Sequence, residues 1–344
     1  MTPSEALRAS PLRTFRAMAF DGGDRLREIR LRLRPPGSDQ LLLRVHTCGV
    51  CRTDLHLLDG DLHAPRRPIV PGHEIVGTVL AAGPQTSGFS VGDRVGATWL
   101  ARSCLHCRWC TTGRENLCPQ ARFNGLHEHG GYATHALVDA RFCVHLPDRY
   151  DDLQAAPLLC AGLIGYRALR AAGDEADHIG LYGFGAAGHL IAQVAIAEAR
   201  HVYAFTRPGD GRAQALATRL GATWAGDSTQ RAPRELDAAL IFAADGALVP
   251  RALAQIAPGG TVVCGGIHMS DIPSFAYRLL WGERVVKSIA NLTRADARDF
   301  MALAARIPLQ CEVEAFSLGD ANEALSRMRA GRITGAAVLD CRGD

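Results

Sequence analysis

Apolar and polar positions follow different patterns in the two halves of the chain. Between residues 17 and 100, short apolar runs are bounded by glycine, proline and aspartate, which indicates β-strands. The clearest runs are 17–20, 41–45 and 75–80, and residues 92–95 follow a turn and start one more strand. Because glycine and proline interrupt this stretch so often, we expect a small antiparallel barrel whose chemistry is mounted on the loops between strands.

After residue 151, apolar runs alternate with stretches rich in alanine and leucine. We expect helices at 153–171, 189–199, 253–256, 295–305 and 318–330. We expect strands at 179–182, 201–205, 238–242, 260–266 and 285–289, and a final strand at 333–339. Apolar strands that alternate with helices predict a parallel, doubly wound sheet.

The length predicts more than one domain. The chain has 344 residues, whereas an ordinary domain has ~100–200. We therefore predict an α/β protein with a β-rich domain at 17–152, on which 290–344 packs back, and a doubly wound domain at 153–289. Residues 1–16 mix Arg, Pro and Ser without an apolar core and are expected to form a loose tail.

Composition excludes several classes of protein. The sequence is 47% hydrophobic and 21% charged, as in soluble globular proteins. A formal net charge of +3 indicates neither a nucleic-acid partner nor an anionic membrane, and no apolar run approaches the ~18 residues of a membrane span. The eleven cysteines, an odd number, favour metal binding in a reducing cytoplasm over a disulfide framework.

Four cysteines form a compact cluster: Cys104, Cys107, Cys110 and Cys118. Four thiolates close a tetrahedral shell, so this spacing predicts a structural zinc site. The alternatives are reduced or disulfide-bonded loop cysteines, or a zinc ribbon that binds nucleic acid. The near-neutral charge of the chain and the lack of a basic stripe argue against the ribbon.

A second set of metal ligands is suggested by Cys51 and His73, with Cys160 as a third. Two residues about twenty positions apart are weak evidence for a metal, and Cys160 could equally be buried for packing alone. Three protein ligands, however, are what a catalytic zinc with one open position requires.

A glycine-rich motif follows the first strand of the doubly wound region. Gly183, Gly185 and Gly188 form G-x-G-x-x-G, with an apolar strand before it and a helix after it. In that context the motif predicts a dinucleotide site, with the pyrophosphate at the helix N-terminus.

The residues after the next strand bear on the choice of cofactor. Where an acidic residue would hold the ribose of NAD, the chain has Thr206 and Arg207, which suit a 2′-phosphate. The pattern therefore favours NADP(H) over NAD(H). The alternative is that Arg207 is a solvated turn residue and Asp210 binds the ribose.

In this order, the motifs resemble those of the zinc-dependent medium-chain alcohol dehydrogenases. The likeness covers nearly the whole chain after about residue 17. Its most specific marks are Gly49–His56, Gly72–Glu74, the four-cysteine loop and Leu159–Gly162. The resemblance implies a GroES-like catalytic domain with a Rossmann cofactor domain, and a catalytic zinc held by Cys51, His73 and Cys160.

The resemblance also implies catalytic roles. Glu74 would lie behind the metal as an occasional ligand, and Asp54 would orient His73. Thr53 would hydrogen-bond the alcohol oxygen and pass its proton, through the cofactor ribose, to His56. Zinc would act as a Lewis acid, and the nicotinamide would exchange a hydride with the substrate.

Some positions depart from the family pattern. Ile164 stands where relatives often have Thr, and Ala336 stands where they often have an arginine that faces the pyrophosphate. Arg52 and Arg294 are expected to supply that charge instead. Trp99 would narrow the substrate pocket, unless it is ordinary core, and Leu58 would replace a larger aromatic residue there.

The sequence thus predicts reversible hydride transfer between NAD(P) and a small-to-medium primary alcohol or aldehyde. A polyol or cinnamyl-type dehydrogenase is the alternative on the same scaffold, and a zinc-ribbon binding protein is the non-enzymatic one. The resemblance further suggests a homodimer or homotetramer, built partly by pairing of edge strands.

Overall fold

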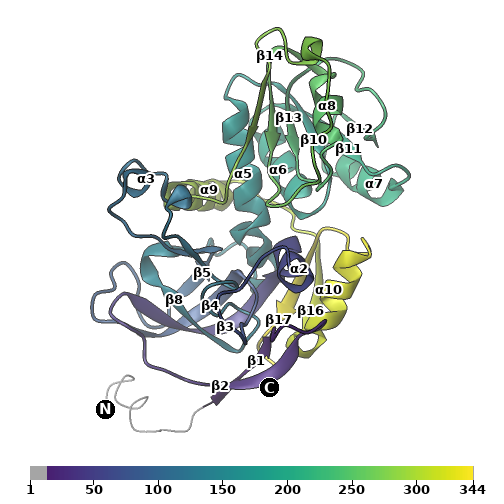
Figure 1. Ribbon diagram of the computed structural model, residues 1–344. Helices are drawn as coiled ribbons and strands as arrows, with labels where there is room; N and C mark the ends of the chain where they lie inside the picture. Colours follow the sequence, from purple (N-terminus) through teal and green to yellow (C-terminus); the bar gives the residue numbers. More distant parts are fainter. Residues whose placement is uncertain (1–13, 344) are drawn as a thin grey trace. The chain divides into compact units, whose positions relative to one another are not determined.

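The computed structural model describes residues 14–343, which divide into two compact units (Figure 1). The first unit runs to Cys160 and also includes Thr293–Ala305 and the chain from Glu312 onward. The second unit comprises Ala161–Leu292 and Arg306–Cys311. Of the loose tail expected at 1–16, residues 1–13 lie outside the described part, and residues 14–16 already belong to a strand.

The first unit is built on a seven-stranded sheet in the order β16-β17-β3-β4-β5-β9, with β8 also paired to β3. Its strands are β3 (Gln40–Val50), β4 (Glu74–Ala82), β5 (Arg94–Ala97), β8 (His135–Asp139), β9 (Cys143–His145), β16 (Val313–Ser317) and β17 (Ala336–Asp340). Strand β17 pairs antiparallel with β3, so that Leu339 lies opposite Cys48. Strand β17 therefore completes the sheet whose strands β3 and β4 flank the segments with Cys51 and His73.

Shorter elements surround this sheet. Two antiparallel pairs join β1 (Thr14–Ala19) to β2 (Arg27–Arg32) and β6 (Leu100–Arg102) to β7 (Arg122–Phe123). The α-helices are α2 (Arg52–Asp59), α3 (Arg108–Thr111), α4 (Asp152–Ala155), α9 (Arg294–Arg306) and α10 (Ala321–Arg329). Turns of 3₁₀-helix are η1 (Glu115–Leu117), η2 (Ala140–Phe142), η3 (Ala156–Leu159) and η5 (Leu318–Asp320).

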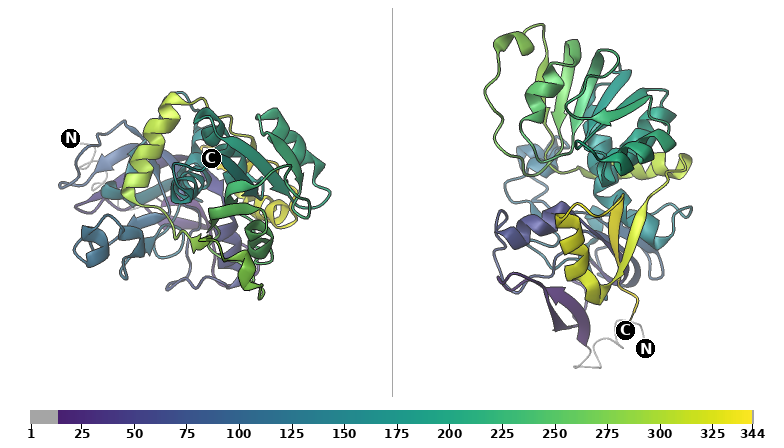
Figure 2. Two further views of the ribbon diagram at one scale, coloured as in Figure 1. Left: turned by 90° about the horizontal axis from the view of Figure 1, so that it is seen from above. Right: turned by 90° about the vertical axis from the view of Figure 1, so that its right-hand side faces the viewer.

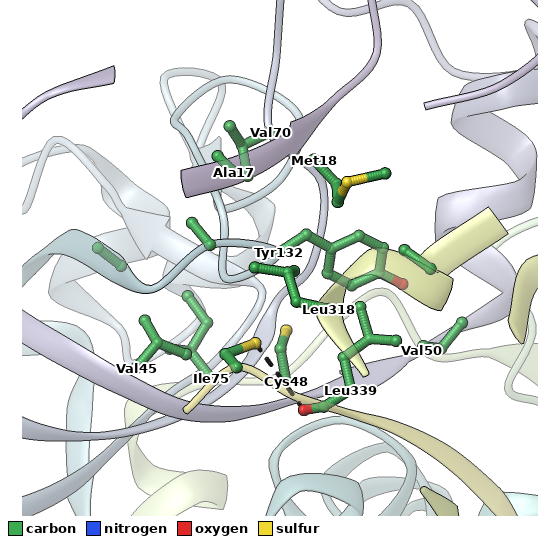
Figure 3. Packing of buried hydrophobic residues seen from close by; sticks show 14 of the residues in the cluster. Ala17, Met18, Val45, Cys48, Val50, Val70, Ile75, Tyr132, Leu318 and Leu339 are labelled. Atoms are coloured by element: carbon green, nitrogen blue, oxygen red, sulfur yellow. Dashed lines mark hydrogen bonds between the residues drawn. The ribbon is translucent and has the colours of Figure 1, made fainter. Parts of the chain in front are cut away.

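The core of the first unit is apolar and contains one large tyrosine. Tyr132 is fully buried in the same cluster as Met18, Cys48, Leu318 and Leu339 (Figure 3). These residues come from both ends of the chain, so burial of this core joins the N-terminal and C-terminal segments.

The second unit is a six-stranded parallel sheet in the order β12-β11-β10-β13-β14-β15, flanked by helices (Figure 2). Its strands are β10 (His178–Tyr182), β11 (His201–Thr206), β12 (Trp224–Asp227), β13 (Leu236–Ile241), β14 (Ile256–Cys264) and β15 (Val285–Ser288). The helices are α5 (Ala161–Ala172), α6 (Ala186–Ala197), α7 (Gly211–Arg219) and α8 (Leu248–Leu253), with a 3₁₀ turn, η4 (Tyr277–Leu279). The predicted doubly wound α/β architecture is confirmed.

Several local predictions are wrong for physical reasons. Thr53 and His56 lie on helix α2 and not on a loop, because Cys51 caps that helix and Gly60 ends it in the left-handed conformation. The single helix expected at 153–171 is broken at Cys160, whose φ of −134° is not helical. Ile256, expected to end a helix, instead begins β14.

Within residues 14–343, no helix combines the length and apolar character that crossing a membrane requires.

Candidate metal centres and active site

The first unit brings Cys51, His73, Glu74 and Cys160 together. One ligand atom from each lies within 4.8 Å of the others. Cys51 caps α2, Glu74 begins β4 with His73 immediately before it, and Cys160 occupies the helix break after η3. Residues that are far apart in the sequence therefore converge because β3 and β4 pair and η3 packs against them.

Two features of this set fit a metal ion. The Nε2 atom of His73 is buried and has no hydrogen-bond partner in the described structure, although a buried polar atom normally has one. The sulfurs of Cys51 and Cys160 lie 3.9 Å apart as free thiols. Two thiols and one imidazole are ligands that zinc prefers, and Glu74 adds a carboxylate.

The electrostatics of the set favour a thiolate. The pKa of Cys51 lies well below that of an ordinary thiol because Cys160 donates a hydrogen bond to it and His73 faces it, which outweighs burial. Burial alone lowers the pKa of His73, but Cys51 and nearby carboxylates raise it to about 9. The deprotonated sulfur is the form that binds metal.

Asp54 stands behind His73. Its Oδ1 atom is 3.8 Å from Nδ1 of His73, which is an ion-pair distance and longer than a hydrogen bond. The carboxylate accepts hydrogen bonds from the backbone N–H groups of Cys51 (2.9 Å) and Gly72 (3.2 Å) and from the hydroxyl of Tyr132 (3.0 Å). Tyr132 was not among the predicted site residues, because nothing in its local sequence shows that its ring reaches Asp54.

A small pocket opens beside His73. Its lining comprises Thr53, Asp54, Leu57, Leu62, His73, Trp99, Asn124, Gly125 and Leu126. Among them, Trp99 is stacked on Phe123, and its ring lies 5.9 Å from that of His73. Leu58 does not line this pocket, contrary to expectation. Thr53 and Leu57 are four residues apart and share one face of α2, whereas Leu58 packs against the apolar core.

His56 lies one turn after Thr53 on the same helix and is buried. Its Nδ1 atom is 2.8 Å from the carboxylate of Asp61, which follows the left-handed turn at Gly60. Asp61 was not among the predicted site residues, because no motif in the sequence marks it as a partner of His56. The carboxylate fixes the orientation of the imidazole.

The second cysteine set also comes together. The sulfurs of Cys104, Cys107, Cys110 and Cys118 lie within 4.8 Å of one another. The backbone N–H of Cys107 donates to Sγ of Cys104 at 3.3 Å, and that of Gln120 donates to Sγ of Cys118 at 3.4 Å. Hydrogen bonds from backbone N–H groups, chiefly that of His106 and then that of Cys107, lower the pKa of Cys104 to about 6 and outweigh its desolvation. Four free thiols in this arrangement fit a closed structural zinc site.

Arg294 lies against this cysteine loop. Its backbone N–H and its guanidinium both donate to Glu115, at 2.9 and 3.0 Å. Glu115 is buried, and in the sequence it lies between Cys110 and Cys118. The guanidinium of Arg294, which was expected to face a pyrophosphate, is therefore already paired with Glu115 inside the first unit. Arg52, the other expected cation, is exposed at the start of α2.

In the second unit, the three glycines have the geometry that a dinucleotide site needs. Gly183 follows β10 with a φ of +96°, which only glycine adopts readily. A Cβ on Gly188 would lie 2.4 Å from the carbonyl oxygen of Gly183, so helix and strand could not pack as closely. A Cβ on Gly185 would meet nothing within 4 Å, so the start of α6 is open to a phosphate.

The end of β11 carries one exposed cation. Arg207 is 69% exposed, and its guanidinium is 3.8 Å from the carboxylate of Asp210. Thr206 is buried, and its hydroxyl accepts from Gln214 at 3.1 Å and contacts the carbonyl oxygen of Gly226 at 3.3 Å. Asp210 caps α7 by accepting from the N–H of Ala213. Of these residues, Arg207 has the side chain that is open to a ligand.

Known proteins match this chain in sequence and in structure. Residues 37–148 match the alcohol dehydrogenase GroES-like domain family. The chain is 46% identical to a probable alcohol dehydrogenase, AdhA, of Mycobacterium tuberculosis (strain CDC 1551 / Oshkosh), over 91% of this chain and 92% of that protein.

Two solved structures are similar throughout. One is the cobalt- and zinc-bound thermostable alcohol dehydrogenase of Pyrobaculum aerophilum, with a TM-score of 0.86, 25% identity, and coverage of 95% of this chain and 100% of that one. The other is the acetophenone reductase of Geotrichum candidum in complex with NAD, with a TM-score of 0.86, 27% identity, and coverage of 96% and 98%. With its two domains, its two candidate metal sites and these relatives, the chain belongs to the zinc-dependent medium-chain alcohol dehydrogenase family.

Proposed function

We propose that the chain is an alcohol dehydrogenase that exchanges a hydride between NAD(P) and small-to-medium primary alcohols or aldehydes. The proposal depends mainly on one observation: the buried Nε2 atom of His73 has no hydrogen-bond partner in the described structure and lies beside the thiols of Cys51 and Cys160. His73 also lines the small pocket. In this proposal the first unit is the catalytic domain and the second binds the nicotinamide cofactor. The similarity to a zinc-bound alcohol dehydrogenase and to an NAD-bound reductase supports both assignments.

The residues of the first unit have distinct roles in this reaction. Cys51, His73 and Cys160 would hold a catalytic zinc, which supplies Lewis-acid polarisation of the substrate oxygen. Thr53 lines the pocket and presents its hydroxyl to that oxygen. His56 accepts the proton that leaves the active site, and Asp61 holds its imidazole in place. The nicotinamide supplies the hydride chemistry.

The lining of the pocket bears on the substrate class. Leucines and Trp99 dominate it, and its one amide, that of Asn124, already donates to the carbonyl oxygen of Thr98 at 2.8 Å. A polyol would leave several hydroxyls without partners in such a pocket, which costs binding free energy. A primary alcohol with an apolar chain is therefore the better fit, and a cinnamyl-type alcohol is the second candidate.

Removing the hydroxyl of Thr53 should nearly abolish turnover. We expect Thr53→Ala to lower kcat at least about a hundredfold, because a positioned proton-transfer group contributes roughly 10²–10⁴ in rate. The measurement is steady-state turnover on a panel of alcohols and aldehydes, together with zinc content.

The matched control for this variant is Thr53→Ser, which keeps the hydroxyl and should keep most of the activity. Zinc content should equal that of the wild type in both variants, since Thr53 is not a proposed ligand. If the wild type turns over no alcohol or aldehyde, the proposed function is wrong. If Thr53→Ala keeps full activity, the proposed role of Thr53 is wrong.

His56→Gln should lower activity mainly at low pH. Glutamine cannot accept a proton, and at about pH 6 solvent offers few other bases, so we expect a loss of roughly a hundredfold there and a smaller loss at about pH 9. The measurement is kcat against pH for alcohol oxidation. His145→Gln, which changes an exposed histidine on β9, is the control. Parallel profiles for wild type and His56→Gln would contradict the relay.

We propose NADP(H) as the preferred cofactor. Arg207 is exposed at the end of β11, and Asp210, the acidic alternative, caps α7 and faces Arg207. A guanidinium binds a phosphate by charge-assisted hydrogen bonds. We do not expect Thr206 to bind the 2′-phosphate, because its hydroxyl is already hydrogen-bonded inside the fold.

Arg207→Ala should therefore lower kcat/KM for NADPH by about tenfold or more, the value of one charge-assisted hydrogen bond, and leave kcat/KM for NADH nearly unchanged. Arg219→Ala, at the opposite end of α7, is the control. The comparison needs both cofactors under saturating aldehyde. A wild-type kcat/KM that is clearly higher with NADH would reject the preference.

We further propose that two copies associate through the edge strand β15, as a homodimer or within a homotetramer. Strand β15 ends the sheet of the second unit. Just before it in the chain come Tyr277 and Trp281, which are 71% and 68% exposed, and Val285 on the strand itself is also exposed. An edge strand with exposed apolar side chains is normally covered, and a two-fold axis lets identical strands pair.

Trp281→Glu should shift the protein toward monomer at micromolar concentration, because a charge would be buried in the interface. Light scattering coupled to size exclusion gives the mass. Val91→Glu, at an exposed apolar residue of the first unit, should leave the mass unchanged. A monomeric wild type, or a Trp281→Glu mass equal to the wild-type mass, would exclude this interface.

A further inference from the structure

Tyr132 connects the apolar core of the first unit to the proposed catalytic metal ligands. Its ring is fully buried among apolar side chains, including Met18, Leu318 and Cys48 (Figure 3). Its hydroxyl, at the far end of the ring, donates to Oδ2 of Asp54 at 3.0 Å. Asp54 is itself only 3% exposed, so its carboxylate relies on protein donors in place of water.

The backbone around Tyr132 is fixed to the loop that precedes His73. The N–H of Tyr132 donates to the carbonyl oxygen of Pro71 at 3.0 Å. The N–H of Gly131 donates to the carbonyl oxygen of Gly72 at 3.0 Å. On its other side, the carbonyl oxygen of Tyr132 accepts from the N–H of Met18 at 2.8 Å. The tyrosine therefore cannot shift without moving this loop.

Gly72 allows the ring to lie directly over the loop. Its φ is +93°, and a Cβ there would lie 2.3 Å from Cδ1 of Tyr132. The N–H of Gly72 donates to Oδ1 of Asp54 at 3.2 Å, so both oxygens of the carboxylate have donors. The residue that follows Gly72 is His73, whose Nδ1 faces that same Oδ1 atom.

We propose that Tyr132 is a positioning residue for the catalytic metal: its hydroxyl fixes the Asp54 carboxylate, which in turn holds His73 in the orientation that binds the ion. Without the hydroxyl, Oδ2 of Asp54 keeps one donor, the N–H of Cys51. The carboxylate is then free to rotate away from His73, and the imidazole loses its orientation. This inference rests on the proposed metal site of Cys51, His73 and Cys160.

The test is the rate at which zinc leaves Tyr132→Phe in the presence of an excess of a chromogenic chelator. We expect release from the catalytic set to accelerate about tenfold or more, since partners behind metal ligands typically change metal affinity 10–100-fold. Release from the four-cysteine site of the same molecules should stay unchanged and serves as an internal control. Cobalt substitution should also show a shifted visible absorption spectrum for the catalytic set.

Tyr150→Phe is the matched control variant. Tyr150 is another buried tyrosine of the first unit, and its hydroxyl donates to the carbonyl oxygen of Ala304 at 2.9 Å, away from the metal ligands. It should release both zinc ions at wild-type rates. Equal release from Tyr132→Phe, Tyr150→Phe and wild type would overturn the proposal.

A double-mutant cycle separates positioning from general loosening of the fold. In Asp54→Asn, the further change Tyr132→Phe should add less than about twofold to the release rate, because both changes act through one carboxylate. Fully multiplicative effects would overturn the proposal. If the wild type holds no zinc at the catalytic set, the proposed metal site itself is wrong. If the wild type holds two zinc ions and Tyr132→Phe has no effect on their release, only the positioning role of Tyr132 is wrong.

Discussion

The buried carboxylate of Asp54 is the constraint on which the candidate active site depends. Three donors converge on it: the start of α2 through Cys51, the loop before β4 through Gly72, and the apolar core through Tyr132. A buried carboxylate without donors is costly, so these three segments are held in one arrangement. That arrangement places Cys51 and His73 beside each other and beside Cys160.

The glycine and cysteine motifs could be predicted from the sequence because their function depends on local spacing. Gly183, Gly185 and Gly188 act within one turn, and the cysteines from 104 to 118 act within one loop. The alternation of strands and helices likewise predicted the parallel sheet. In both motifs, the residues that act together are close together in the chain.

What the sequence did not predict depends on contacts between distant residues. Leu58 was expected in the pocket, but the helical phase of α2 gives that place to Thr53 and Leu57. Arg294 was expected near a phosphate, but it is paired with Glu115, 179 positions away in the sequence. Tyr132 is 78 positions from Asp54. No local pattern records such pairs, so only the fold reveals them.

In the proposed function, Cys51, His73 and Cys160 hold a metal ion separate from that of the four-cysteine loop. The most direct measurement is zinc per chain in the purified wild type, in Cys160→Ala and in Cys143→Ala, whose cysteine belongs to neither set. We expect two zinc ions in the wild type and in Cys143→Ala and one in Cys160→Ala. A single zinc in the wild type, or two in Cys160→Ala, would contradict it.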